Sequence, residues 1–239
     1  MIPLKDTIPS RTFPVVNWIL IALNVVIFMG ELAADSHGQA EALISNFGLI
    51  PARFLYYRDA HELSTLITSM FLHGGWAHLF SNMLALYIFG DNVEDRLGPA
   101  KYLIFYLLCG LAAQMSQIYF NRDSTVPGIG ASGAIAGVLG AYLLLYPHAR
   151  VITLIPVFFY PLFVEIPAVF YLGFWFVSQL LNGTLEIVHT IYSPEVRHAG
   201  GIAWWAHAGG FVAGALLVWP FATPKRKMQK KYPDEYYAW

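Results

Sequence analysis

The feature that most constrains this chain is a series of long apolar runs that contain almost no charge. Hydrophobic residues make up 57% of the 239 residues and charged residues only 12%, whereas soluble domains average roughly 45–50% and about 25%. So few charges cannot cover the surface of a soluble fold. The apolar content excludes intrinsic disorder, and a single cysteine excludes a disulfide scaffold. We therefore predict a polytopic protein of the lipid bilayer.

The apolar runs locate six transmembrane helices, because a helix needs about 20 apolar residues to cross the hydrocarbon core. The predicted spans are residues 13–29, 76–89, 102–120, 130–146, 166–181 and 202–221. Prolines interrupt residues 151–165, where we predict an interfacial or looped segment. The predicted fold is thus an all-α, six-helix bundle over residues 1–221, followed by a basic cytoplasmic tail at residues 222–239.

The distribution of Lys and Arg predicts the orientation of these spans. Six spans place both termini on one side, and that side holds ten of the 14 Lys and Arg residues. Because positive residues gather in cytoplasmic loops, both termini are predicted to be cytoplasmic in a multi-pass protein of the plasma or inner membrane. A cleaved signal peptide is the alternative for residues 13–29, and it would leave the other spans oriented as before. The net charge of −1 argues against a nucleic-acid partner.

Four polar residues stand out within these predicted spans: His78, Asn82, Ser132 and His207. The second, fourth and sixth spans run in the same direction, and a helix rises 1.5 Å per residue. Each of the four residues therefore lies within roughly 10 Å of the outer end of its helix. Polar groups are costly inside a bilayer, so residues from three distant segments at one depth indicate a functional site.

Glycines spaced four residues apart occur in two of the same spans: Gly133 with Gly137, and Gly210 with Gly214. The second pair lies on the helix face that carries His207. Small-residue faces let helix backbones approach closely. If these two faces pack together, Ser132 and His207 come within reach of each other. Such faces also serve packing between molecules, so the sequence leaves the oligomeric state open.

A serine and a histidine at one depth can perform nucleophilic catalysis, with the histidine as the base. No carboxylate lies at the right depth to orient the histidine, so we predict a Ser–His dyad. The first backbone N–H groups of the fourth span lack helical partners and could stabilise an oxyanion. His78 and Asn82 share a helix face and could add side-chain donors, although an interhelical hydrogen bond is an equal alternative for either one.

Taken together, these motifs resemble the rhomboid family of intramembrane serine proteases. Residues 130–133 read GASG and resemble the GxSG motif of the family. Residues 206–214 resemble its AHxxG…G segment, and residues 73–82 resemble its second-helix pattern of His and Asn. Residues 90–98 resemble the turn that follows that helix. The four motifs occur in the order and topology of the family.

The resemblance implies hydrolysis of peptide bonds in or near transmembrane segments of membrane-protein substrates, close to the outer face, without a cofactor or metal. It implies Ser132 as nucleophile and His207 as general base, and it places His78 and Asn82 in the oxyanion hole with the backbone N–H of Ser132. It also implies supporting structural roles for His73, Gly130, Gly133, Gly210, Gly214, Glu94 and Arg96. A catalytically silent relative that binds transmembrane helices is the alternative.

The chain departs from the family pattern in two places. Ser64 and Thr65 stand where many members carry Trp-Arg, and Ala136 stands where some members carry a ring that packs on the histidine. We predict that Trp204 or Trp205 holds His207 instead. Substrates are expected to enter laterally, past the fifth span and the loop at residues 182–201.

Overall fold

The computed structural model describes residues 1–157, 160–192 and 202–222, and these residues are mostly helical. The α-helices are α1 (Val15–Ser36), α2 (Ala40–Phe47), α3 (Pro51–Tyr57), α4 (Ala60–Thr68), α5 (Trp76–Ala85), α6 (Asp91–Leu97), α7 (Pro99–Phe120), α8 (Ser132–Leu145), α9 (Ala168–Tyr192) and α10 (Trp204–Phe221). A 3₁₀ turn, η1 (Ser69–Phe71), follows α4, and a π turn, η2 (Leu86–Gly90), joins α5 to α6.

Each predicted span coincides with a helix: α1, α5 with η2, α7, α8, α9 and α10. Among the described residues, three helices are long and apolar enough to cross a membrane, namely α1, α7 and the part of α9 at Ala168–His189. α8 is apolar but shorter. The chain is therefore a helical membrane protein, and the number of crossings stays a prediction.

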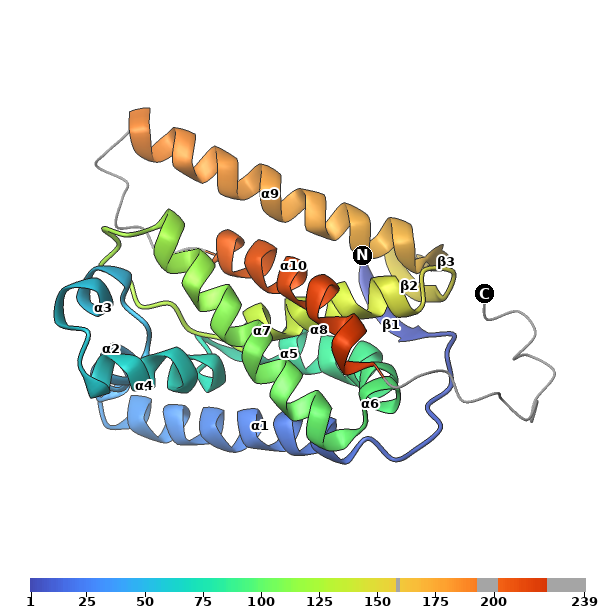
Figure 1. Ribbon diagram of the computed structural model, residues 1–239, viewed down its shortest axis with the longest axis horizontal. Coiled ribbons are helices and arrows are strands. Elements are labelled where there is room, and N and C mark those ends of the chain that lie inside the picture. Colours follow the sequence, from blue (N-terminus) through green and yellow to red (C-terminus); the bar gives the residue numbers. More distant parts are fainter. Residues whose placement is uncertain (158–159, 193–201, 223–239) are drawn as a thin grey trace.

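α1 and α9 lie roughly along the long axis of the molecule, whereas α7 crosses it obliquely, with α8 and α10 packed against α7 (Figure 1). Three short helices, α2 to α4, lie between the first two predicted spans and gather at one end (Figure 1). Buried side chains of α7, α8, α10 and the π turn form the core.

A three-stranded antiparallel sheet of order β1-β2-β3 lies at the opposite end (Figure 1). Its strands are β1 (Ile2–Asp6), β2 (Arg150–Val157) and β3 (Tyr160–Pro167). The all-α prediction was wrong here, since β2 and β3 pair as antiparallel strands in the stretch predicted to be an interfacial or looped segment. β-branched residues favour strands along β2, while Pro156 and Pro161 pair with each other near the end of β2 and the start of β3. The third strand comes from the distant N-terminus, a pairing that local sequence does not reveal.

The two described chain ends lie at this same end of the bundle. The Asp6 carboxylate of β1 accepts hydrogen bonds from Tyr142 near the end of α8 and from Asn92 of α6. At the end of α10, the Phe221 ring lies 6.0 Å from that of Phe105, near the start of α7. Two chain ends on the same side of the bundle agree with an even number of crossings. The basic tail at residues 223–239 lies outside the described residues, and the side that is cytoplasmic stays a prediction.

Helix α6 ties this end of the bundle to α1. The Glu94 carboxylate accepts hydrogen bonds from the backbone N–H groups of Val16 and Asn17, at 3.1 and 2.7 Å. These N–H groups belong to the first turn of α1 and have no partner within the helix. Arg96 follows on α6 and is partly buried. The two residues that resemble a structural turn of the family thus lie at a helix junction.

Candidate active site

Ser132 and His207 meet although 75 residues separate them in sequence. Ser132 is the first residue of α8, and His207 lies in the first turn of α10. Their side chains are hydrogen-bonded, with 2.8 Å between Ser132 Oγ and His207 Nε2. A hydroxyl bonded to an imidazole in this way is arranged for proton transfer from serine to histidine.

The glycine faces of α8 and α10 produce this contact. A Cβ atom on Gly210 would lie 2.0 Å from the carbonyl oxygen of Gly133, and one on Gly214 would lie 1.9 Å from that of Gly137. Both distances are far shorter than an ordinary contact, and the opposing atoms are backbone. Only glycine therefore allows the two helices to approach until Ser132 reaches His207.

His78 of α5 faces the serine across Gly130. The backbone N–H of Gly74 lies 3.3 Å from His78 Nδ1, which therefore accepts, so a neutral ring carries its hydrogen on Nε2. A Cβ atom on Gly130 would lie 2.6 Å from that Nε2 atom and 3.6 Å from Ser132 Oγ. Gly130 has a φ of +125°, which glycine adopts readily. The N–H donor of His78 and the hydroxyl of Ser132 thus lie on either side of the same glycine.

Asn82 is buried one turn further along α5 and contacts His73. Its Nδ2 atom lies 3.0 Å from His73 Nε2, while His73 Nδ1 donates to the carbonyl of Phe71 at 3.2 Å. The backbone N–H of His73 is held by the buried carboxylate of Glu31, at 3.1 Å from each oxygen. An amide nitrogen has two hydrogens, so the bond to His73 leaves one for another acceptor.

Two groups of α9 hold His207, in addition to one of the two predicted tryptophans. Gln179 Oε1 lies 2.8 Å from His207 Nδ1. The Trp175 ring lies 5.7 Å from the imidazole, at an interplanar angle of 33°. Trp204 meets His207 only edge-on at 6.5 Å, and Trp205 stacks on Phe120 of α7 at 3.8 Å instead. Of the two predicted tryptophans, Trp204 thus contacts His207 and Trp205 does not, because the rotation of a helix about its axis does not follow from its sequence.

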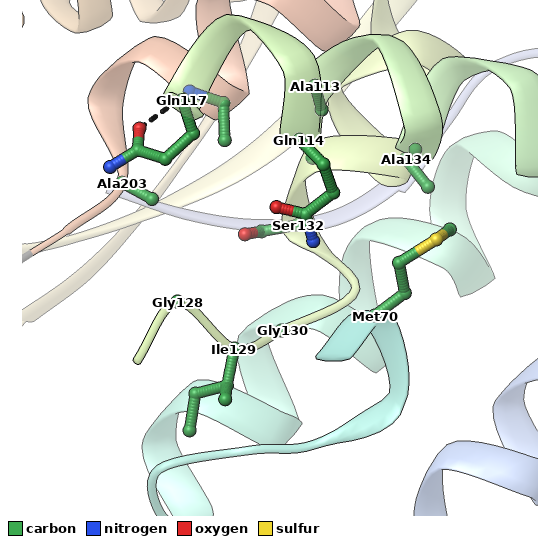
Figure 2. A pocket seen from close by; sticks show the side chains of 13 residues that line it. Met70, Ala113, Gln114, Gln117, Gly128, Ile129, Gly130, Ser132, Ala134 and Ala203 are labelled. Atoms are coloured by element: carbon green, nitrogen blue, oxygen red, sulfur yellow. Dashed lines mark hydrogen bonds between the residues drawn. The ribbon is translucent and has the colours of Figure 1, made fainter. Parts of the chain in front are cut away.

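Sequence reasoning overlooked three glutamines in the predicted spans: Gln114, Gln117 and Gln179. Their polar side chains in apolar helices were the available signal. Gln114 donates to Ser69 Oγ at 2.8 Å, and Gln117 accepts from the backbone N–H of Ala206, at the start of α10. Gln114 and Gln117 line a cavity beside Ser132 (Figure 2). The cavity has a volume of about 20 Å³, which is room for about one water molecule.

The first departure from the family pattern lies in α4, where the Thr65 side chain is buried and donates to the carbonyl of Glu62. Glu62 in turn forms an ion pair with Arg53 of α3, with 2.6 Å between Nε and Oε1. Ser64 donates to the carbonyl of His61. In the part of the chain that the structure describes, no cluster of three or more His, Cys, Asp or Glu side chains could hold a metal ion.

The fold and the site together define a helical membrane protein with a serine and a histidine joined across glycine-packed helices. The sequence model of the Rhomboid domain matches residues 60–224, more than half of the chain. The matched segment contains α5, α8 and α10, which carry the four polar residues of the site. The chain therefore belongs to the rhomboid family.

Named relatives include proteases and an inactive member. The chain is 28% identical over 171 residues to Rhomboid protein 1, mitochondrial, of Saccharomyces cerevisiae, covering 70% of this chain and 44% of that protein. It is 30% identical over 135 residues to the putative rhomboid protease YdcA of Bacillus subtilis, covering 56% and 64%. Inactive RHOMBOID-like protein 8 of Arabidopsis thaliana is 34% identical over 85 residues, or 36% and 24%. The match spans less than two thirds of each of these relatives.

Proposed function

We propose that this protein is an intramembrane serine endopeptidase that hydrolyses peptide bonds in or near transmembrane segments of membrane proteins. The observation that carries the proposal is the 2.8 Å contact between Ser132 Oγ and His207 Nε2. A silent, helix-binding relative has no need of this pair in hydrogen-bonding contact, and family members with protease names support the catalytic alternative.

In the first half of the proposed reaction, His207 Nε2 takes the proton of Ser132 as Oγ attacks the substrate carbonyl carbon. The carbonyl oxygen becomes an oxyanion that needs nearby donors. The backbone N–H of Ser132 lies at the N-terminus of α8, where N–H groups lack helical partners and the helix dipole is positive. His78 Nε2–H and the second amide hydrogen of Asn82 complete the proposed oxyanion hole.

In the second half, His207 gives its proton to the leaving amine, which leaves an acyl group on Ser132. A water molecule then loses a proton to His207 and attacks the acyl carbon, which releases the carboxylic acid product and restores the serine. The small cavity between Ser132, Gln114 and Gln117 offers a polar place for that water in an otherwise apolar bundle.

The proposed topology has six spans, cytoplasmic termini and the site near the outer face. Ser132 begins α8, whereas the sheet follows the end of α8, so the site and the sheet lie at opposite ends of a helix about 20 Å long. The excess of Lys and Arg on the side of the sheet supports a cytoplasmic sheet. We propose a multi-pass protein of the plasma or inner membrane, although three relatives carry mitochondrial names. Membrane fractionation tests the location.

The deciding experiment compares cleavage of a model transmembrane substrate by the wild type, Ser132→Ala and His207→Ala, each reconstituted in liposomes. Only the wild type should cleave, while all three melt at the same temperature in detergent. Ser36→Ala and His148→Ala are controls, since both side chains are exposed and lie outside the site. Cleavage by Ser132→Ala would refute the assignment of the nucleophile.

A further inference from the structure

We propose that Gln179 of α9 is a positioning residue that completes a Ser132–His207–Gln179 triad with a neutral third member. The inference rests on the proposed function, because it concerns the same histidine. It replaces the dyad expected from the sequence, in which nothing orients the imidazole. Gln179 acts through His207 and has no contact with the reacting serine.

The hydrogen bonds of Gln179 select one tautomer of His207. Its Nε2 atom lies 3.0 Å from both the carbonyl oxygen of Trp175 and the hydroxyl of Ser178, and it donates to the carbonyl. The Oε1 atom is thereby turned to His207 Nδ1 at 2.8 Å. A carbonyl oxygen only accepts, so Nδ1 carries the hydrogen and Nε2 presents its lone pair to Ser132. This is the tautomer that a general base requires.

The placement of Gln179 is unusual for its helix. Only 22% of the residues in the 18-residue apolar stretch of α9 are buried, against 39% in that of α7. α9 therefore lies at the periphery of the bundle. Its outward face is apolar, as Phe170, Phe174, Val177, Leu181 and Leu185 show. Gln179 is only 5% exposed and points the other way. A buried amide is costly unless it is hydrogen-bonded, so a glutamine on this apolar helix indicates a functional partner, which is His207.

Trp175, one turn before Gln179, supplies the ring that Ala136 lacks. Its ring lies over His207, and the neighbouring Phe176 stacks on Phe211 of α10 at 4.6 Å and 19°. An aromatic and a polar support of the histidine therefore both belong to α9. Because α9 also flanks the predicted entry path, the serine reaches full reactivity only while α9 is packed against α10.

The test measures the rate at which a small fluorophosphonate labels Ser132 in detergent, where no transmembrane substrate has to enter. Gln179→Leu keeps the size of the side chain but removes the acceptor, and it should slow labelling about 10- to 100-fold. The matched control is Asn182→Leu. Asn182 is a partly buried amide on the next turn of α9 and donates to the carbonyl of Ser178, away from His207. It should label at the wild-type rate.

A second variant provides a readout that a purely structural role would not change. In Gln179→Glu, a carboxylate beside the imidazole favours its protonated form, so the acid limb of the labelling rate should move to higher pH. Asn182→Asp adds the same charge one turn away and should move it less. Besides the carboxylate introduced in each variant, His78 is the titratable side chain that acts on His207, and both variants retain it.

The outcomes separate this inference from the proposed function. If the wild type neither labels nor cleaves, the proposed function fails. If the wild type is active and Gln179→Leu labels at its rate, the triad is refuted while the protease assignment stands. Slower cleavage with unchanged labelling would likewise refute it, because it would place Gln179 in substrate entry. If Gln179→Leu melts at a lower temperature than the wild type, the test rests on Gln179→Glu. A folded Gln179→Glu protein whose labelling rate keeps the acid limb of the wild type would refute the triad.

Discussion

Replacing Gly210 with alanine tests whether the contact between α8 and α10 sets the geometry of the active site. The new Cβ atom would lie 2.0 Å from the carbonyl oxygen of Gly133 and 3.0 Å from its carbonyl carbon. Both are backbone atoms of a buried helix, so neither can rotate aside as a flexible side chain could. The two helices must therefore separate.

The separation can be estimated from ordinary contact distances. Atoms in van der Waals contact are about 3.5 Å apart, so the helices must move by about 1.5 Å at this point. His207 lies one turn before Gly210 and Ser132 directly precedes Gly133, so most of the movement reaches the pair. Their hydrogen bond of 2.8 Å would then be broken. A misplacement of about 1 Å can cost about 100-fold in rate, and overpacking typically costs about 1–3 kcal/mol in stability.

The assay combines the labelling rate of Ser132 with the melting temperature in detergent. Gly210→Ala should label about 100-fold more slowly and melt earlier, by roughly 2–4 °C for each kcal/mol lost. The control is Gly173→Ala on α9, where a Cβ atom would have nothing within 4 Å; alanine also favours helix there. A Gly210→Ala protein with the wild-type rate and melting temperature would refute the reasoning.

Two further predictions concern opposite ends of the bundle. Gly130→Ala should slow labelling about 100-fold, because its Cβ atom would lie 2.6 Å from His78 Nε2. The control Gly38→Ala is also at positive φ but has nothing within 4 Å of its Cβ atom, so it should label at the wild-type rate. Equal labelling rates for the two variants would contradict a role for Gly130 in spacing His78 from Ser132. Burial, with a smaller contribution from the Asp91 carboxylate, raises the pKa of Asp6 to about 7. Asp6 therefore keeps its proton to higher pH in the folded state than in the unfolded chain. The stability that the protonated Asp6 contributes is complete below about pH 4 and is lost as the pH rises through about 7. Asp6→Asn should reduce that fall in melting temperature between pH 4 and 8, and an undiminished fall would contradict the assignment.

The candidate site was predictable where local pattern and spacing sufficed. Ser132 and His207 were found because polar residues are rare in apolar spans and because glycines in register mark packed helix faces. Gln179 carried the same polar signal in the fifth predicted span. Its partner, however, depends on which face α9 turns toward α10, and hydropathy does not fix that rotation.

The sequence by itself determined that this is a membrane protein, where its long apolar helices lie, and which two residues are the candidates for catalysis. Those properties follow from the length of apolar runs and the spacing of small residues, which act locally along the chain. The tertiary structure alone decided the three-stranded sheet, which pairs residues 2–6 with a hairpin begun at Arg150. It also decided what orients His207, since Trp175 and Gln179 reach the imidazole only through the packing of α9 on α10. Contacts between distant segments depend on how helices rotate and dock, and that choice is made by the whole bundle.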